Sequence, residues 1–62
     1  MTDINVLYLH TDSNSNSLNV DADEKGVHFV VTPSNDKPFV VTLTEKQASK
    51  FADSINHYLV TK

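Results

Sequence analysis

The sequence predicts an α+β domain in which a four-stranded antiparallel β-meander is followed by one C-terminal amphipathic helix packed on one sheet face, a β-β-β-β-α order. Three observations predict it. Four short apolar runs are joined by polar segments, which are too short for the crossover of a dozen residues that parallel strands need. Apolar residues then recur at helical spacing from Thr44 to about Val60. Finally, 62 residues suit a single small domain, residues 1–62.

The first predicted strand, Ile4–His10, is apolar on both faces, as in strands that are covered on both sides. One face would carry Ile4, Val6 and Tyr8, and the other Leu7 and Leu9. Because the pairing register cannot be read from the sequence, either set could point away from the helix.

The next two predicted strands alternate more regularly. After the polar loop Thr11–Ser17, apolar residues occupy every second position of Leu18–Ala22, which is typical of a half-exposed strand. The turn Asp23–Gly26 ends in the only glycine of the chain, where a positive φ is easiest. Val27–Thr32 follows and again has one predominantly apolar face.

The fourth predicted strand, Phe39–Leu43, follows a loop bounded by two prolines and leads directly into the helix. Thr44 and Gln47 fit a capping box, in which the threonine caps the first turn and the glutamine reaches back. The helical stripe consists of Ala48, Phe51, Ala52, Ile55, Tyr58 and Leu59. We expect it to pack on the sheet face that carries Val20, Val27, Phe29, Val31, Phe39, Val41 and Leu43.

The opposite sheet face would keep apolar residues that have no partner within one chain. The candidate interface consists of Leu7, Tyr8, Leu9, His28, Val30, Val40 and Thr42. Contiguous exposed apolar patches tend to mark interfaces, so we expect a homodimer, a different protein partner, or both. A dimer could form by stacking sheet faces or by joining edge strands. The alternative is that β-branched residues simply suit strands and tolerate water.

Charge and composition argue against several functions. The net charge is −3, the five basic residues are scattered lysines, and arginine is absent. Without arginine, bidentate contacts to guanine or phosphate are lost, which argues against nucleic acid as a partner. There is no basic signal-peptide start and no apolar run near the ~20 residues that span a bilayer. We therefore expect a soluble, cytoplasmic protein that does not bind membranes.

The loop Asp12–Asn16 has the D-x-N-x-N spacing of a calcium-binding loop. However, Ser17 stands where that loop needs glycine, and Asp23 where it needs a bidentate glutamate. A solvated hairpin loop is the stronger interpretation, and whether it binds an ion stays open.

No combination of residues indicates catalysis. The three histidines, His10, His28 and His57, fall on different predicted elements without metal-ligand spacing. The serines cluster in a polar loop, and a chain this small offers little concavity in which to organise a nucleophile. We expect no cofactor and no enzymatic activity.

In its order of elements the chain resembles the core of the transcriptional-coactivator and Whirly-type single-stranded-DNA-binding proteins. The best local match is the strand-into-helix passage Val40–Gln47. The resemblance implies a dimer that grips a single strand with its sheets, and hence weak single-stranded nucleic-acid binding as the alternative function. Basic and aromatic residues are sparse on the strands here, so no binding residue is carried over. Our main expectation is a small non-catalytic binding or regulatory accessory protein that acts through protein–protein contacts.

Overall fold

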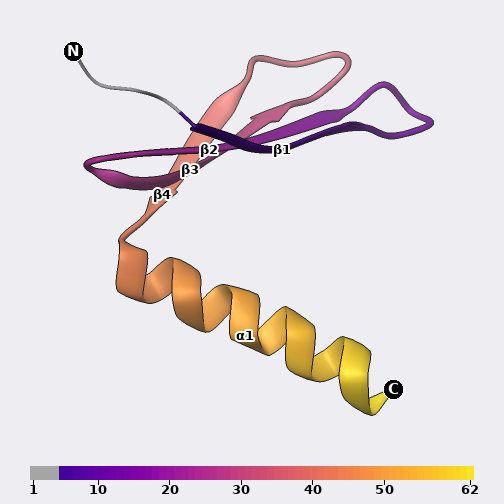
Figure 1. Cartoon of the computed structure of the whole chain (residues 1–62). Coiled ribbons are helices and arrows are strands. Elements are labelled where there is room, and N and C mark those ends of the chain that lie inside the picture. The colour runs from indigo at the N-terminus through magenta and orange to yellow at the C-terminus, as the bar shows by residue number, and fades with distance from the viewer. Residues whose placement is uncertain (1–4) are drawn as a thin grey trace.

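A computed structural model describes residues 5–62 and has four strands and one helix in the predicted order (Figure 1). The elements are β1 (Asn5–Thr11), β2 (Ser17–Asp23), β3 (Gly26–Thr32), β4 (Phe39–Leu43) and α1 (Glu45–Thr61). The α+β prediction is confirmed. Ile4, which the sequence places in the first strand, lies outside the described residues.

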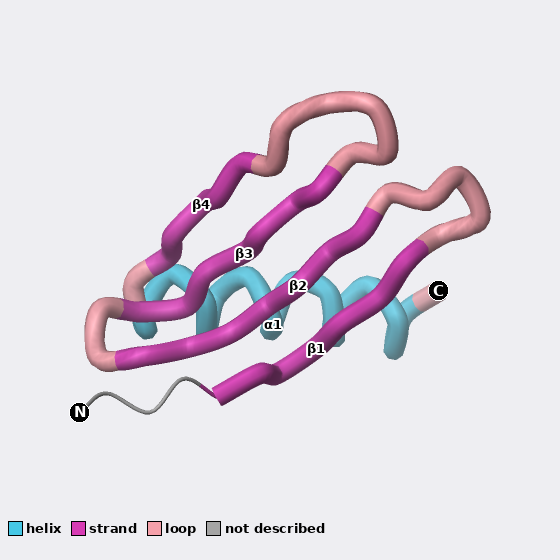
Figure 2. The backbone as a smooth tube through the Cα atoms, turned by 90° about the horizontal axis from the view of Figure 1, so that it is seen from above, coloured by secondary structure: helices cyan, strands magenta, loops and turns pink. Residues whose placement is uncertain are grey.

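The strands form one open antiparallel sheet in the order β1-β2-β3-β4, and α1 passes beneath it (Figure 2). Every pairing joins strands that are neighbours in the sequence, as expected for a meander. The two edges of the sheet are therefore β1 and β4.

The turn between β2 and β3 requires its glycine. Gly26 has φ +136° and is buried. A Cβ atom at this position would collide with the backbone carbonyl oxygen of Leu43 on β4. The hydrogen bond from the Lys25 N–H to Asp23 Oδ1, 2.8 Å long, closes the turn. Glycine is thus needed here both for its backbone conformation and for the close approach of β4.

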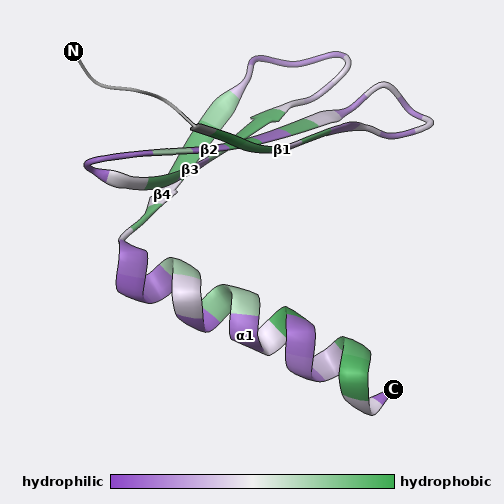
Figure 3. Cartoon of the chain, viewed as in Figure 1, coloured by the Kyte–Doolittle hydropathy of each residue, from purple (hydrophilic) through white to green (hydrophobic). Residues whose placement is uncertain are grey.

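Directly paired residues share a face of the sheet, so the register assigns the faces. Val20 pairs with Phe29, and Phe29 with Val41. The helix side therefore carries the apolar set that the sequence predicts, namely Val20, Val27, Phe29, Val31, Phe39, Val41 and Leu43. Figure 3 shows hydrophobic residues on the strands and at intervals along α1.

A bulge in β1 breaks the alternation that the sequence predicts for that strand. Val6 pairs with Asp21 and Tyr8 with Val20, so Leu7 is an extra residue between the two pairs. Tyr8 consequently lies on the helix side with Val20, while Val6 stays on the outer face. Neither of the two predicted alternating sets remains on one face.

The capping box is present at the start of α1. The Gln47 N–H donates to Thr44 Oγ1 over 3.2 Å, and the Thr44 N–H donates to Gln47 Oε1 over 3.0 Å. At the other end, the Lys62 N–H donates to the carbonyl of Tyr58. The helix thus begins and ends within about one residue of its predicted bounds. Among the described residues, no helix has the length and apolarity needed to cross a membrane.

α1 covers only part of the sheet. Its close contacts are with β3 and β4, where the rings of Phe29 and Phe51 meet edge to face with centroids 5.2 Å apart. From the end of β4 the helix slants away from the sheet towards its C-terminus (Figure 1). Val20, at 8% exposure, is the only buried hydrophobic residue in the part of the chain that the structure describes.

Candidate functional site

An open groove of about 570 Å³ lies between α1 and the sheet. Its sheet wall consists of Leu7, Val20, Val27 and Phe29. Its helix wall consists of Ala48, Phe51, Ala52, Ile55 and Leu59, together with the polar residues Glu45, Ser49 and Asn56. At about 30 Å³ per water molecule, this volume holds roughly 20 waters against walls that are mostly apolar.

The groove leaves exposed helical side chains that the sequence predicts to pack on the sheet. Phe51 and Ile55 are each 45% exposed and Leu59 is 56% exposed. Leu7, a candidate interface residue on the sheet wall, is 58% exposed. Apolar surface of this kind gains about 25 cal/mol for every Å² removed from water. The groove is therefore a surface on which a complementary apolar partner would bind favourably.

The apolar surface extends from the groove to both edges of the sheet. On β4, Phe39 and Val41 are about half exposed on the helix side. On β1, Tyr8 is about half exposed, and its ring stacks on that of His10 with centroids 6.2 Å apart. Two rows of paired residues cross this face, Tyr8–Val20–Phe29–Val41 and His10–Leu18–Val31–Phe39, and His10 is their only charged or strongly polar member.

The outer face mixes apolar and polar residues. The register gives the rows Leu9–Asn19–Val30–Val40, with one polar member, and Val6–Asp21–His28–Thr42, with three. Five of the seven candidate interface residues lie here, namely Leu9, His28, Val30, Val40 and Thr42. The other two, Leu7 and Tyr8, lie on the helix side, because the bulge displaces them. The structure therefore does not bring the seven candidates together on one surface, and a role of any of them in an interface stays a prediction.

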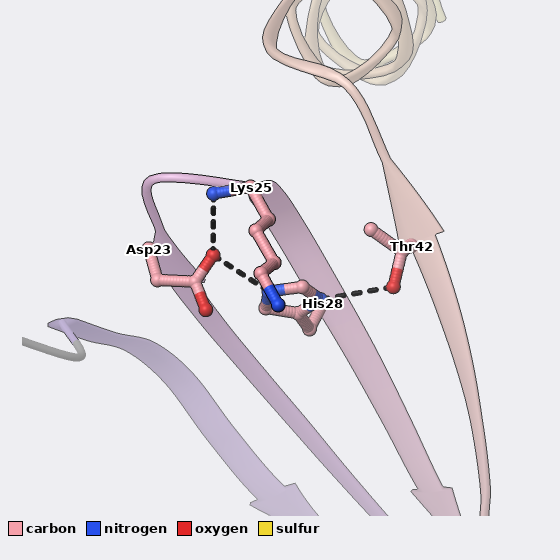
Figure 4. A network of polar contacts seen from close by, with 4 residues as sticks. All are labelled: Asp23, Lys25, His28 and Thr42. Carbon is pink, nitrogen blue, oxygen red and sulfur yellow. Dashed lines mark hydrogen bonds and ion pairs between the residues drawn. The ribbon is translucent and has the colours of Figure 1, made fainter. Parts of the chain in front are cut away.

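A small polar network organises one end of the outer face (Figure 4). His28 Nδ1 lies 2.9 Å from Thr42 Oγ1, and His28 Nε2 lies 2.9 Å from Asp23 Oδ1. The side chains of His28 and Asp23 are each 19% exposed. The hydrogen bond from His28, followed by that from the Lys25 backbone, lowers the pKa of Asp23 below its usual value.

Asp23 is the polar residue that the sequence interpretation missed as a partner of His28. The signal was available, because Asp23 and Gly26 flank a two-residue turn, and His28, two residues after Gly26, lies diagonally opposite Asp23 in the hairpin. The network links β2, β3 and β4 on the outer face. We interpret it as a structural feature that holds these three strands together.

In the loop Asp12–Asn16, which has the spacing of a calcium-binding loop, the Asp12 carboxylate accepts hydrogen bonds from the loop itself. Asp12 Oδ1 accepts hydrogen bonds from the backbone N–H groups of Asn14, over 2.9 Å, and Asn16, over 3.0 Å. The hydrogen bond from Asn16 lowers the pKa of Asp12, although desolvation opposes it. Ser15 takes a positive φ of 66°, and Asn16 Oδ1 accepts from the Ser34 N–H of the neighbouring loop. Across residues 5–62, no three His, Cys, Asp or Glu residues are grouped so as to hold a metal ion.

No protein-family model matches the chain, and comparison with curated proteins and with solved structures gives no match either.

Proposed function

We propose that this protein is a small, non-catalytic binding or regulatory accessory protein, which acts through protein–protein contacts and forms a homodimer. We propose the cytoplasm as its location, since a chain without cysteine suits a reducing compartment. The observation that carries the proposal is the open apolar groove between α1 and the sheet, with Val20 alone buried among the described hydrophobic residues.

The radius of gyration and the exposed surface of the chain support the proposal that a binding partner covers part of its surface. Its radius of gyration is 13.2 Å, whereas a compact domain of this length has about 10.6 Å. It exposes 5172 Å², whereas a compact protein of 6.9 kDa exposes about 4,000 Å². The exposed surface thus exceeds that of a compact protein by about 1,200 Å². A standard interface buries about 800 Å² on each partner, so the excess is large enough for one interface.

The test is the molar mass, measured by light scattering on a sizing column over a wide range of protein concentration. We expect a species near twice 6.9 kDa that dissociates only on strong dilution. A mass of one chain at every concentration would refute the homodimer. As a control, the same column is run in mild urea. This run checks that the dimer and the folded structure are lost together.

A second candidate function is weak binding of single-stranded nucleic acid. The observation that favours it is the exposed Tyr8 ring stacked on His10, since proteins that bind single strands offer aromatic rings to bases. The lack of arginine and the net charge of −3 argue against it. Fluorescence anisotropy with a labelled oligonucleotide tests it. Binding that weakens with added salt would support this function, whereas absence of binding at low salt would refute it.

A further inference from the structure

We infer that the groove is closed by α1 of a second copy of this chain, with the two helices antiparallel and their apolar stripes in contact. This inference rests on the proposed homodimer and specifies its interface. The interface that we infer lies on the helix side of the sheet. The sequence places most of the candidate interface on the outer face instead.

The stripe of α1 can meet its own copy without burying a charge. Ala52, Ile55 and Leu59 line the groove and share one side of the helix. Lys46, Lys50 and Asp53 are all exposed, and at 100° per residue they project from the opposite side of α1. A two-fold interface needs a surface that is complementary to itself, and an uncharged apolar stripe meets this requirement.

The charges at the helix ends favour the antiparallel arrangement. Glu45 lies in the first turn of α1 and lines the groove, while Lys62 follows the last turn. In an antiparallel pair, each Glu45 lies near the end that carries Lys62 of the second copy. The macrodipoles of the two helices also oppose each other in this arrangement. A parallel pair would instead place like charges and like dipole ends together.

The outer face fits a second copy poorly. Asn19 and Asp21 stand within its two rows, and Asp23 lies at one end. Stacking two outer faces would bring the carboxylates of Asp21 and Asp23 towards those of the second copy and remove them from water, which costs free energy. The helix side, in contrast, offers an open groove whose lining is mostly apolar.

Single-cysteine variants test the inference directly, because the natural chain has no cysteine. Ile55→Cys places a thiol near the middle of the stripe, where antiparallel copies approach their two-fold axis. His57→Cys is the matched control on the solvent side of the same helix. Val40→Cys reports on the outer face. Each dimer is treated with a short bifunctional maleimide, and the rate of covalent dimer formation is measured on a denaturing gel.

We expect Ile55→Cys to cross-link about a hundredfold faster than the other two variants, because an assembled dimer holds its thiols at millimolar rather than micromolar effective concentration. Faster cross-linking through Val40→Cys, or equal rates for Ile55→Cys and His57→Cys, would overturn the inference while the homodimer stands. A natural chain that is monomeric by light scattering would refute the homodimer itself. Circular dichroism of each variant confirms that the rates are compared between folded proteins.

Discussion

Replacing Gly26 by alanine should destabilise the fold strongly. The residue has φ +136°, and an added Cβ would collide with the carbonyl oxygen of Leu43. A side chain in such a backbone conformation costs about 1–3 kcal/mol, and forcing atoms into a packed position costs about 1–3 kcal/mol more. The reduced freedom of the unfolded chain returns about 0.4–1 kcal/mol. We therefore expect Gly26→Ala to lower the free energy of unfolding by about 3 kcal/mol, taken from these ranges.

This loss is large for a chain of 62 residues, whose total stability is of the order of 3–9 kcal/mol. The midpoint of thermal unfolding should fall by about 12–24 °C. The collision also pushes on the segment that leads from β4 into α1, so the groove should be disturbed together with the turn. Urea unfolding followed by circular dichroism, at one fixed protein concentration, measures the effect.

Two matched variants separate the causes. Lys25→Ala changes an exposed side chain in the same turn and should alter stability by no more than about 0.5 kcal/mol. D-alanine at position 26, introduced by chemical synthesis, tolerates the positive φ and directs its Cβ away from the Leu43 oxygen. It should retain most of the stability. The reasoning is refuted if L-alanine costs less than about 1 kcal/mol, or if D-alanine costs as much as L-alanine.

Three further substitutions probe other parts of the fold. Thr44→Ala removes the N-cap oxygen of α1 and should cost about 1 kcal/mol in urea unfolding, while Thr44→Ser should cost much less; equal stabilities would contradict the role of the cap. Phe51→Leu removes the edge-to-face contact with Phe29 but keeps an apolar side chain. It should lower the free energy of unfolding by about 0.5–1.5 kcal/mol. An unchanged free energy of unfolding would mean that the ring contact contributes nothing. Asp23→Asn should lower stability at neutral pH, because the pKa of Asp23 is lowered in the folded state by its hydrogen bond from His28. That stabilisation is complete above the unfolded pKa near 4 and is lost as the pH falls through the lower folded value, so the two proteins should converge in urea unfolding below about pH 4. A difference that stays constant down to pH 2 would contradict this assignment.

Features that depend on neighbouring residues could be predicted from the sequence. The capping box of Thr44 and Gln47 spans a single helical turn, and the structure confirms both of its hydrogen bonds. The alternation of Leu18, Val20 and Ala22 fixes one face of β2 because the side-chain period of a strand is two. The position of Gly26 at the end of a short turn is equally local. These signals were sufficient for the order of elements and for the helix-side face of three strands.

Features that depend on distant residues could not be predicted. The bulge at Leu7 exists only because β1 pairs with β2, and nothing in the apolar sequence around it marks the extra residue. As a result, the alternation rule misplaces Leu7 and Tyr8. The groove was missed for a similar reason, because a helical stripe shows which side of α1 is apolar and not how closely it approaches the sheet. The sequence therefore places most of the candidate interface on the outer face, whereas the open apolar groove lies on the helix side.

The meander order also affects how quickly the protein can assemble. Every strand pairs with its neighbour in sequence, and α1 contacts the two strands that directly precede it. Chains with such local contacts fold rapidly, by a process whose rate does not depend on protein concentration. In the homodimer that we propose, closing the groove with a second copy would be a bimolecular step, whose rate rises with concentration. Refolding should then show a fast phase at constant rate and a slower phase that accelerates with concentration. In dilute solution the single chain would persist longest, with the apolar groove and the edge strands β1 and β4 open to other molecules.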